Sequence, residues 1–155
     1  MIRGIGITQW ESPFNEPDAL CGWAKDLGLD TVSMEFDAER CRDKETAKKW
    51  ALTWKNALKQ NGLLPSVLAV NVLCDIGMNQ KKNEERCREI LDLALYAAYV
   101  MEAPAVHLPS FFDGEIRTDE ELEQTIRMIL YAETLGEKYH VLTGRQPPAA
   151  VNSQF

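Results

Sequence analysis

The sequence predicts an α/β protein in which parallel β-strands alternate with helices. Four times, an amphipathic helix ends at a short stop and is followed at once by a β-like stretch. Three of these stops contain a glycine, namely Gly28, Gly62 and Gly136, and the remaining one contains Pro104. Together with a first strand over residues 4–8, they give five strands and four helices, which is the pattern of right-handed βαβ units in a parallel sheet.

The fifth unit departs from this pattern. After Leu142 the chain reads TGRQPPAAVNSQF, which has neither a helical period nor a strand alternation. We therefore expect a partial (β/α) domain over residues 1–143, with about four and a half βα units, and an irregular C-terminal tail over residues 144–155. We interpret the tail as foreign or out-of-frame sequence that shortens the repeat.

The first two helices have recognisable ends. The first is predicted to begin at Pro17, because the missing N–H of proline costs nothing in the first turn, and to end before Gly28. The second is predicted over residues 44–61, with Asp43 as its N-cap and Gly62 after its last turn. Each carries a single apolar stripe, so we expect each to cover a sheet with one side and to face water with the other.

The last two helices show the same one-sided pattern. The third is predicted over about residues 83–101. The fourth begins at a capping box formed by Thr118 and Glu121 and ends at Leu135. The loops after the strands are longer than those before them, and these longer loops have room for function.

The polarity of the two strand faces distinguishes a doubly wound sheet from a (β/α) barrel. In the second strand the side chains of Thr31, Ser33, Glu35 and Asp37 alternate with apolar ones. A doubly wound sheet is apolar on both faces, whereas a (β/α) barrel has helices outside only and a mouth where active sites lie. The alternation predicts a partial TIM barrel. A flavodoxin-like single domain, with a bound flavin, remains the alternative because five strands in about 155 residues would suit it.

Composition narrows the classes of partner. The 155 residues have a net charge of −7 and a pI near 4.9, and the lysines and arginines do not cluster, so we expect no nucleic-acid partner. No stretch approaches the ~20 apolar residues of a membrane span, and no secretory leader is evident, so we expect no membrane and a cytoplasmic location. The four cysteines form no CxxC pair, so we expect them to be reduced structural thiols; they are Cys21, Cys41, Cys74 and Cys87.

Two candidate catalytic residues stand at strand ends. His107 lies at the C-terminal end of the fourth strand, where an imidazole could ligate a metal, bind a sugar hydroxyl or phosphate, or pass a proton. The alternative is a histidine that is merely hydrogen-bonded in the strand. Glu35 and Asp37 lie two residues apart and would point to the same mouth. The alternative for Asp37 is a loop cap, and for Glu35 a structural ion pair.

Aromatic residues complete the candidate site. Trp10 follows the first strand and could form an apolar wall for a sugar ring, and Phe111 follows His107 in the next loop. We name both, with Asp37, as candidate substrate-binding residues. Asn71 and Asp75 carry little weight because the register of the third strand is ambiguous. His140 precedes the fifth strand, at the wrong end of a barrel for catalysis, and reads as structural.

The stretches GIGITQW, LGLDTVSMEF, NGLLPSVLAV and PAVHLPS resemble the xylose isomerase-like sugar phosphate isomerase/epimerase superfamily. The resemblance covers residues 1–142 and corresponds to the first half of that family's (β/α)8 barrel. It implies a ketose isomerase or epimerase with a sugar or sugar phosphate as ligand. It also matches His107 to a frequent strand-four histidine and Glu35 to a common strand-two glutamate.

In that family a divalent metal (Mn, Mg or Co) is held by ligands on strands five to eight. At strand five this chain reads Leu142-Thr143-Gly144-Arg145, where the family has an acidic residue. The resemblance therefore implies a shortened enzyme that binds no metal tightly by itself. The alternative is a non-catalytic half-barrel that acts in binding or assembly.

An open half-barrel would also expose its inner wall. We expect this wall to include Leu68 and Val70 and to drive formation of a homo-oligomer, with two half-barrels closing around one another.

Overall fold

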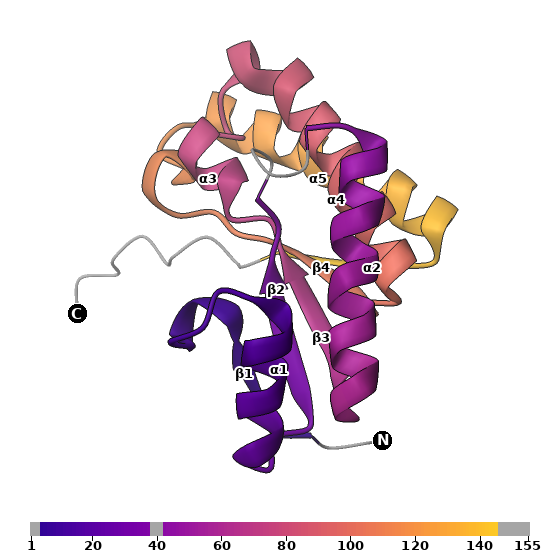
Figure 1. The fold of residues 1–155 in the computed structure, drawn as a ribbon. Coiled ribbons are helices and arrows are strands. Elements are labelled where there is room, and N and C mark those ends of the chain that lie inside the picture. The colour runs from indigo at the N-terminus through magenta and orange to yellow at the C-terminus, as the bar shows by residue number, and fades with distance from the viewer. Residues whose placement is uncertain (1–3, 38–41, 146–155) are drawn as a thin grey trace, which may run out of the picture.

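The computed structural model describes residues 4–37 and 42–145 (Figure 1). The N-terminal half contains β1 (Gly6–Thr8), η1 (Gln9–Glu11), α1 (Pro17–Asp26), β2 (Thr31–Glu35), α2 (Lys44–Asn61), β3 (Leu64–Ala69) and α3 (Val72–Ile76). The C-terminal half contains η2 (Lys81–Asn83), α4 (Glu84–Met101), β4 (Ala105–Leu108), η3 (Phe112–Gly114), α5 (Asp119–Tyr139) and β5 (Leu142–Arg145).

All five strands form one parallel sheet in the order β1-β2-β3-β4-β5. Each strand therefore pairs with the next strand of the chain, and the connecting helices are neighbours in the same sequence: α1 packs on α2, α2 on α4, and α4 on α5. This singly wound order confirms the predicted partial barrel. The flavodoxin-like alternative is wrong because its strand order reverses at a switch point.

The hydrophobic core lies between the sheet and the helices. In β2 the side chains of Val32 and Met34 are fully buried, while the residues between them are only partly buried. Figure 1 shows α2 running alongside β3. From α2, Trp54 reaches this core and packs edge-on against Trp50, which in turn packs against Phe36. These contacts fix the helix-covered face, so the opposite face of the sheet is open.

The assumption that Leu68 and Val70 line the open face is wrong. Both side chains are completely buried. In the sheet register Leu68 pairs with Met34 and with Val106, both of which point toward the helices. Val67 and Ala69 face the open side instead, so the inner wall is built from smaller side chains than the sequence suggested.

The predicted helix ends are confirmed to within about two residues for the first three long helices. Asp43 caps α2 by accepting a hydrogen bond from the backbone N–H of Thr46 at 2.8 Å, and Gly62 follows in the left-handed conformation with φ of 69°. At α5, Thr118 and Glu121 form the reciprocal capping box. No helix within residues 4–37 and 42–145 combines the length and apolar character needed to cross a membrane.

Three elements differ from the sequence prediction. Helix α5 does not stop at Gly136 but continues to Tyr139, and β5 begins at Leu142, where we had expected the strand to end. The short helix α3 is not predicted by the sequence either, and it lies at the start of the connection that follows β3. Of the predicted tail, Gly144 and Arg145 belong to β5, and residues 146–155 lie outside the described part; the division into domain and tail stays a prediction.

Gly136 is needed inside α5 for close packing. A Cβ atom at this position would lie 2.6 Å from the carbonyl oxygen of Val141 and 3.2 Å from the methyl group of Thr143. The chain turns from α5 into β5 across this contact, where the backbone N–H of Val141 donates to the carbonyl oxygen of Gly136. The glycine therefore allows the strand to approach the helix rather than ending the helix.

A pair of glycine substitutions tests this explanation. Gly22→Ala in α1 should stabilise the protein by about 0.5–1 kcal/mol, because a Cβ there meets no atom within 4 Å and alanine favours helix. Gly136→Ala should instead destabilise it by about 1–3 kcal/mol through overpacking. Urea denaturation of both variants measures the difference, and a stabilised Gly136→Ala variant would contradict the packing role.

Candidate functional site

A cross-strand row of residues brings the two candidate catalytic side chains to one face of the sheet. Glu35 pairs with Ala69, Ala69 pairs with His107, and His107 pairs with Gly144. Residues paired across parallel strands point to the same side, and neighbouring strands lie about 4.8 Å apart. Glu35 and His107 are therefore roughly 10 Å apart along the row, on the open face and near the C-terminal ends of their strands.

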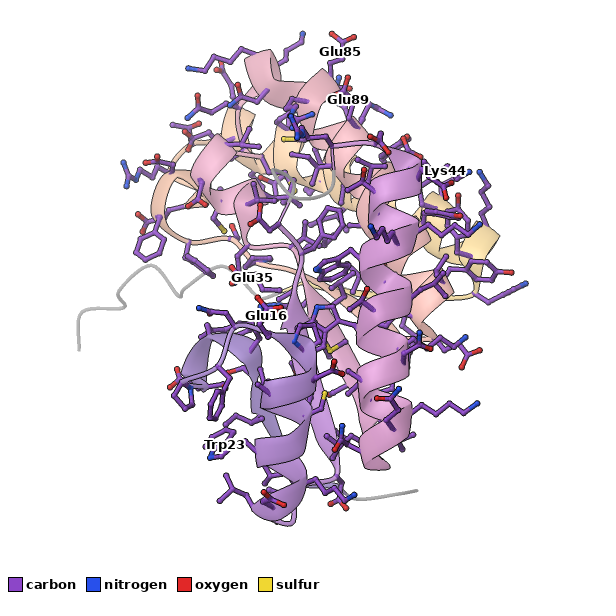
Figure 2. All side chains as sticks on the ribbon, in the orientation of Figure 1. Glu16, Trp23, Glu35, Lys44, Glu85 and Glu89 are labelled. Atoms are coloured by element: carbon purple, nitrogen blue, oxygen red, sulfur yellow. The ribbon has the colours of Figure 1, made fainter. Side chains whose placement is uncertain are left out.

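Glu35 is held by two residues from neighbouring elements, Asn71 through its carboxylate and Gln9 through its backbone. Its Oε1 accepts a hydrogen bond from Nδ2 of Asn71 at 2.9 Å, and its backbone N–H donates to Oε1 of Gln9 at 3.0 Å. Figure 2 shows Glu35 at the upper end of β2, where the strands meet the loops. Sequence reasoning gave Asn71 little weight and missed Gln9. Their common signal is their position just past a strand, since Gln9 follows the last residue of β1 and Asn71 is the second residue after β3.

A polar hollow of about 390 Å³ lies beside Glu35. It brings together three carboxylates, those of Glu35, Asp37 and Asp75, so Asp37 lies in the same hollow as Glu35, as the alternation indicated. The full lining is Gln9, Asn15, Glu35, Phe36, Asp37, Trp50, Val72 and Asp75. A hollow rich in acceptors suits a ligand with several hydroxyl donors.

A second, mainly apolar hollow of about 370 Å³ lies over the middle of the open face. Trp10 forms one wall and His107 another, and small side chains form the floor. Trp10 is 48% exposed, so part of its ring is available for contact. The full lining is Thr8, Trp10, Ser33, Val67, Ala69, Ala105, Val106, His107 and Gly144. The predicted neighbourhood of Trp10 and His107 is present in the structure.

Phe111 is not among the residues that line either hollow. Its ring packs edge-on against Phe112 with 5.0 Å between centroids. Phe112 is the more exposed of the two, at 74%, and its φ of 52° is unusual for a bulky side chain. The pair therefore stands in the loop beyond the row, and Phe111 as a substrate-binding residue stays a prediction.

The described residues do not fit the divalent metal that the resemblance implies. Within residues 4–37 and 42–145 there is no group of three or more His, Cys, Asp or Glu side chains placed to hold a metal ion. The carboxylates of the polar hollow therefore do not form a complete ligand set.

The described cysteines offer no nucleophile for the site. Cys21, Cys74 and Cys87 are free and buried, and Cys41 lies outside the described residues. Burial raises the pKa of Cys21 and of Cys87 to about 11, which keeps both as neutral thiols at pH 7. These buried thiols act as small apolar core side chains.

The imidazole of His107 is tuned by its surroundings. Partial burial lowers its pKa, because the charged form loses hydration. The side chain is therefore mainly neutral at pH 7. A neutral imidazole has one donor and one acceptor nitrogen, so it can both receive a proton from a hydroxyl and orient that hydroxyl.

This shift makes a pH-dependent prediction. In the unfolded chain His107 binds a proton near pH 6.5, whereas in the folded chain it binds one only at lower pH. The free energy of unfolding should therefore fall as the pH decreases through 6.5 toward the lower pKa of the folded state. NMR titration of ¹³C-labelled histidine should give a His107 pKa below 6.5. A His107→Gln variant should lose less stability between pH 7.5 and pH 5.5. A folded-state pKa above 6.5 would contradict the burial argument.

Comparison with solved structures identifies the fold. A xylose isomerase domain protein from Planctomyces limnophilus is similar with a TM-score of 0.67 and 14% identity, over 92% of this chain and 53% of that one. The 3-keto-D-glucoside 4-epimerase of E. coli is similar with a TM-score of 0.71 and 14% identity. The match covers 92% of this chain and 55% of the epimerase. D-Psicose 3-epimerase of Clostridium cellulolyticum, solved with D-tagatose, is similar with a TM-score of 0.69 and 10% identity. The match covers 91% of this chain and 51% of the epimerase.

The present chain spans about half the length of these proteins. No protein-family model and no curated protein sequence matches it. At these identities the likeness is one of fold, and at that level it confirms the resemblance read from the sequence. The five-stranded sheet has the architecture of about half of a xylose isomerase-like barrel.

Proposed function

We propose that this chain forms the sugar-binding half of a ketose isomerase- or epimerase-type barrel. The observation that carries the proposal is the row that sets Glu35 and His107 on one open face with Trp10 beside them. Support also comes from similar folds whose structures contain sugars, D-tagatose in one and D-allulose in another. The ligand class is a small sugar or sugar phosphate.

In this proposal each residue has a distinct task. The Glu35 carboxylate, held in place by Asn71, accepts hydrogen bonds from sugar hydroxyls. The neutral imidazole of His107 binds a second hydroxyl from two strands away. Trp10 packs against the C–H face of the sugar, since an indole ring offers a large apolar surface. The small side chains between them leave room for a sugar ring on the sheet.

A second candidate is a half-barrel that binds or assembles without chemistry. It is favoured by the missing metal ligand set within residues 4–37 and 42–145. For both candidate functions, the proposed location is the cytoplasm and the proposed assembly is a homo-oligomer of this chain. The homo-oligomer can no longer be argued from an inner wall that exposes Leu68 and Val70, because both side chains are buried.

Sugar binding can be measured directly. We expect D-tagatose or D-allulose to shift the NMR signals of His107 and Trp10 in a saturable titration. Glu35→Gln or His107→Ala should weaken this binding by about tenfold, because the first replaces a charged acceptor oxygen by an amide NH2 and the second removes the imidazole. Trp10→Ala should weaken it as well.

His140→Ala is the matched control, because this histidine precedes β5 and so lies at the opposite end of the sheet from His107. Binding should be unchanged in this variant. If neither sugar shifts any signal of the row, or if His140→Ala weakens binding as much as His107→Ala does, the proposed site is wrong.

Catalysis by this chain alone is expected to be absent or very weak. The reason is that metal-assisted proton transfer beside a carbonyl needs a ligand set that residues 4–37 and 42–145 do not assemble. Ketose epimerisation should be assayed with Mn²⁺, Mg²⁺ or Co²⁺ present. Robust turnover that disappears in His107→Ala would show that the chain is a complete catalyst.

A further inference from the structure

A further hollow lies between η2 and the first half of α5, and we call it the α5 hollow. Its volume of about 640 Å³ exceeds that of either hollow described above and lies in the usual range of small-molecule sites. It shares no lining residue with those two hollows. Its polar lining includes Asn79, Lys81, Glu120, Glu123, Gln124 and Arg127.

Two amide side chains of this lining are buried without a full set of hydrogen bonds. Asn79 and Gln124 are only 3% and 4% exposed. Nδ2 of Asn79 donates to the carbonyl oxygen of Glu115 at 2.9 Å, which fixes the orientation of this amide group. Within residues 4–37 and 42–145, neither Oδ1 of Asn79 nor Nε2 of Gln124 has a hydrogen-bond partner. Such buried atoms destabilise a fold unless a ligand or water completes their bonds.

The nearest charge to Gln124 already has a partner. Arg88 donates to Oε1 of Glu84 from Nε at 3.1 Å and from Nη2 at 2.8 Å. Arg88 is the main cause that lowers the pKa of the Glu84 carboxyl, and the nearby Gln124 amide contributes less to this shift. Gln124 therefore stands beside Glu84 without completing a hydrogen bond of normal geometry, and its N–H groups are available to a ligand.

The α5 hollow is lined by charges of both signs. Lys81 and Arg127 supply cations, and Arg127 approaches Glu84 only to 3.8 Å, which is too long for a hydrogen bond. Glu120 and Glu123, from the first two turns of α5, supply carboxylates. None of the ion pairs between described residues involves Lys81, Glu120 or Glu123. Cationic and anionic groups are therefore both available to one ligand.

We propose that the α5 hollow binds a small zwitterion that carries an ammonium and a carboxylate group, as free α-amino acids do. The ammonium group donates to Oδ1 of Asn79 and lies near the carboxylates of α5. The ligand carboxylate accepts from Nε2 of Gln124 and pairs with Arg127 or Lys81. Both buried amide atoms thereby gain the partner that they lack.

Other classes of ligand match the lining less well. A simple anion would lie close to Glu120 and Glu123, and a simple cation would lie close to Lys81 and Arg127. None of the lining residues is aromatic, so neither a sugar ring nor a nucleobase would find a ring to pack against. A zwitterion is the class that meets both charges and both amide atoms.

The side-chain amide signals of the full chain report on binding directly. We expect at least one of L-serine, L-glutamine, L-lysine and L-glutamate to shift the NH2 signals of Asn79 and Gln124 in a saturable ¹⁵N NMR titration. The N-acetyl and the α-carboxamide forms of that amino acid each lack one charge and should bind at least tenfold more weakly. The signal of Asn61 is the internal control, because its Nδ2 donates to the carbonyl oxygen of Ala57 in α2.

Two variants assign the binding to these residues. Arg127→Gln should weaken binding by about tenfold, because it removes a cation opposite the ligand carboxylate. Arg86→Gln is the matched control and should leave binding unchanged, because Arg86 does not line the hollow and its side chain is 49% exposed, against 53% for Arg127. Gln124→Leu should weaken binding similarly, but it should raise the urea midpoint of the ligand-free protein, since a buried donor without a partner is removed.

The opposite results overturn the proposal. Unchanged Asn79 and Gln124 signals with all four amino acids at millimolar concentration would show that the hollow holds water only. An N-acetyl form that binds as tightly as its parent would show a simple anion site. A lower urea midpoint in Gln124→Leu would show that this amide has a structural partner. Because the α5 hollow shares no residue with the proposed sugar site, these results are independent of the proposed function.

Discussion

The structure depends on burial of one face of each strand beneath the helices. Side chains alternate along a strand, so the burial of Val32 and Met34 leaves Glu35 on the opposite, open face. The same alternation in β4 buries Val106 and turns His107 outward from the core. Because the strands are parallel and Glu35, Ala69 and His107 pair across three of them, this single constraint both packs the core and gathers the candidate site.

Much of this arrangement is readable from the sequence, since alternation and helix caps are local signals. The pattern around Glu35 and His107 gave the correct face, and Asp43 and Thr118 gave the correct helix starts. The sequence predicts a helix end at Gly136, because glycine is typical of helix ends as well as of tight packing contacts. Only the short distance to the carbonyl oxygen of Val141 shows that Gly136 serves packing. Asn71 was undervalued because the register of the third strand is ambiguous in the sequence, and because its partner Glu35 is 36 residues away in the chain.

Under the proposed function, the two hollows would divide the recognition of a sugar between them. The polar one offers acceptors to hydroxyls, and the apolar one offers Trp10 and small side chains to the ring. The row through Ala69 joins them, and its small methyl group keeps the path between Glu35 and His107 open. Under the proposed function, the strength of sugar recognition would also depend on whatever covers the open face of the sheet.

The sequential strand order also has a consequence for how the chain folds. Every strand pairs with the strand that follows it after one helical connection, so the loops closed by each pairing are of similar, moderate length. No strand has to wait for a distant segment before it can pair. The sheet can therefore grow one unit at a time during synthesis, with the newest strand always at the edge, as domains do when they fold from the N-terminus on the ribosome.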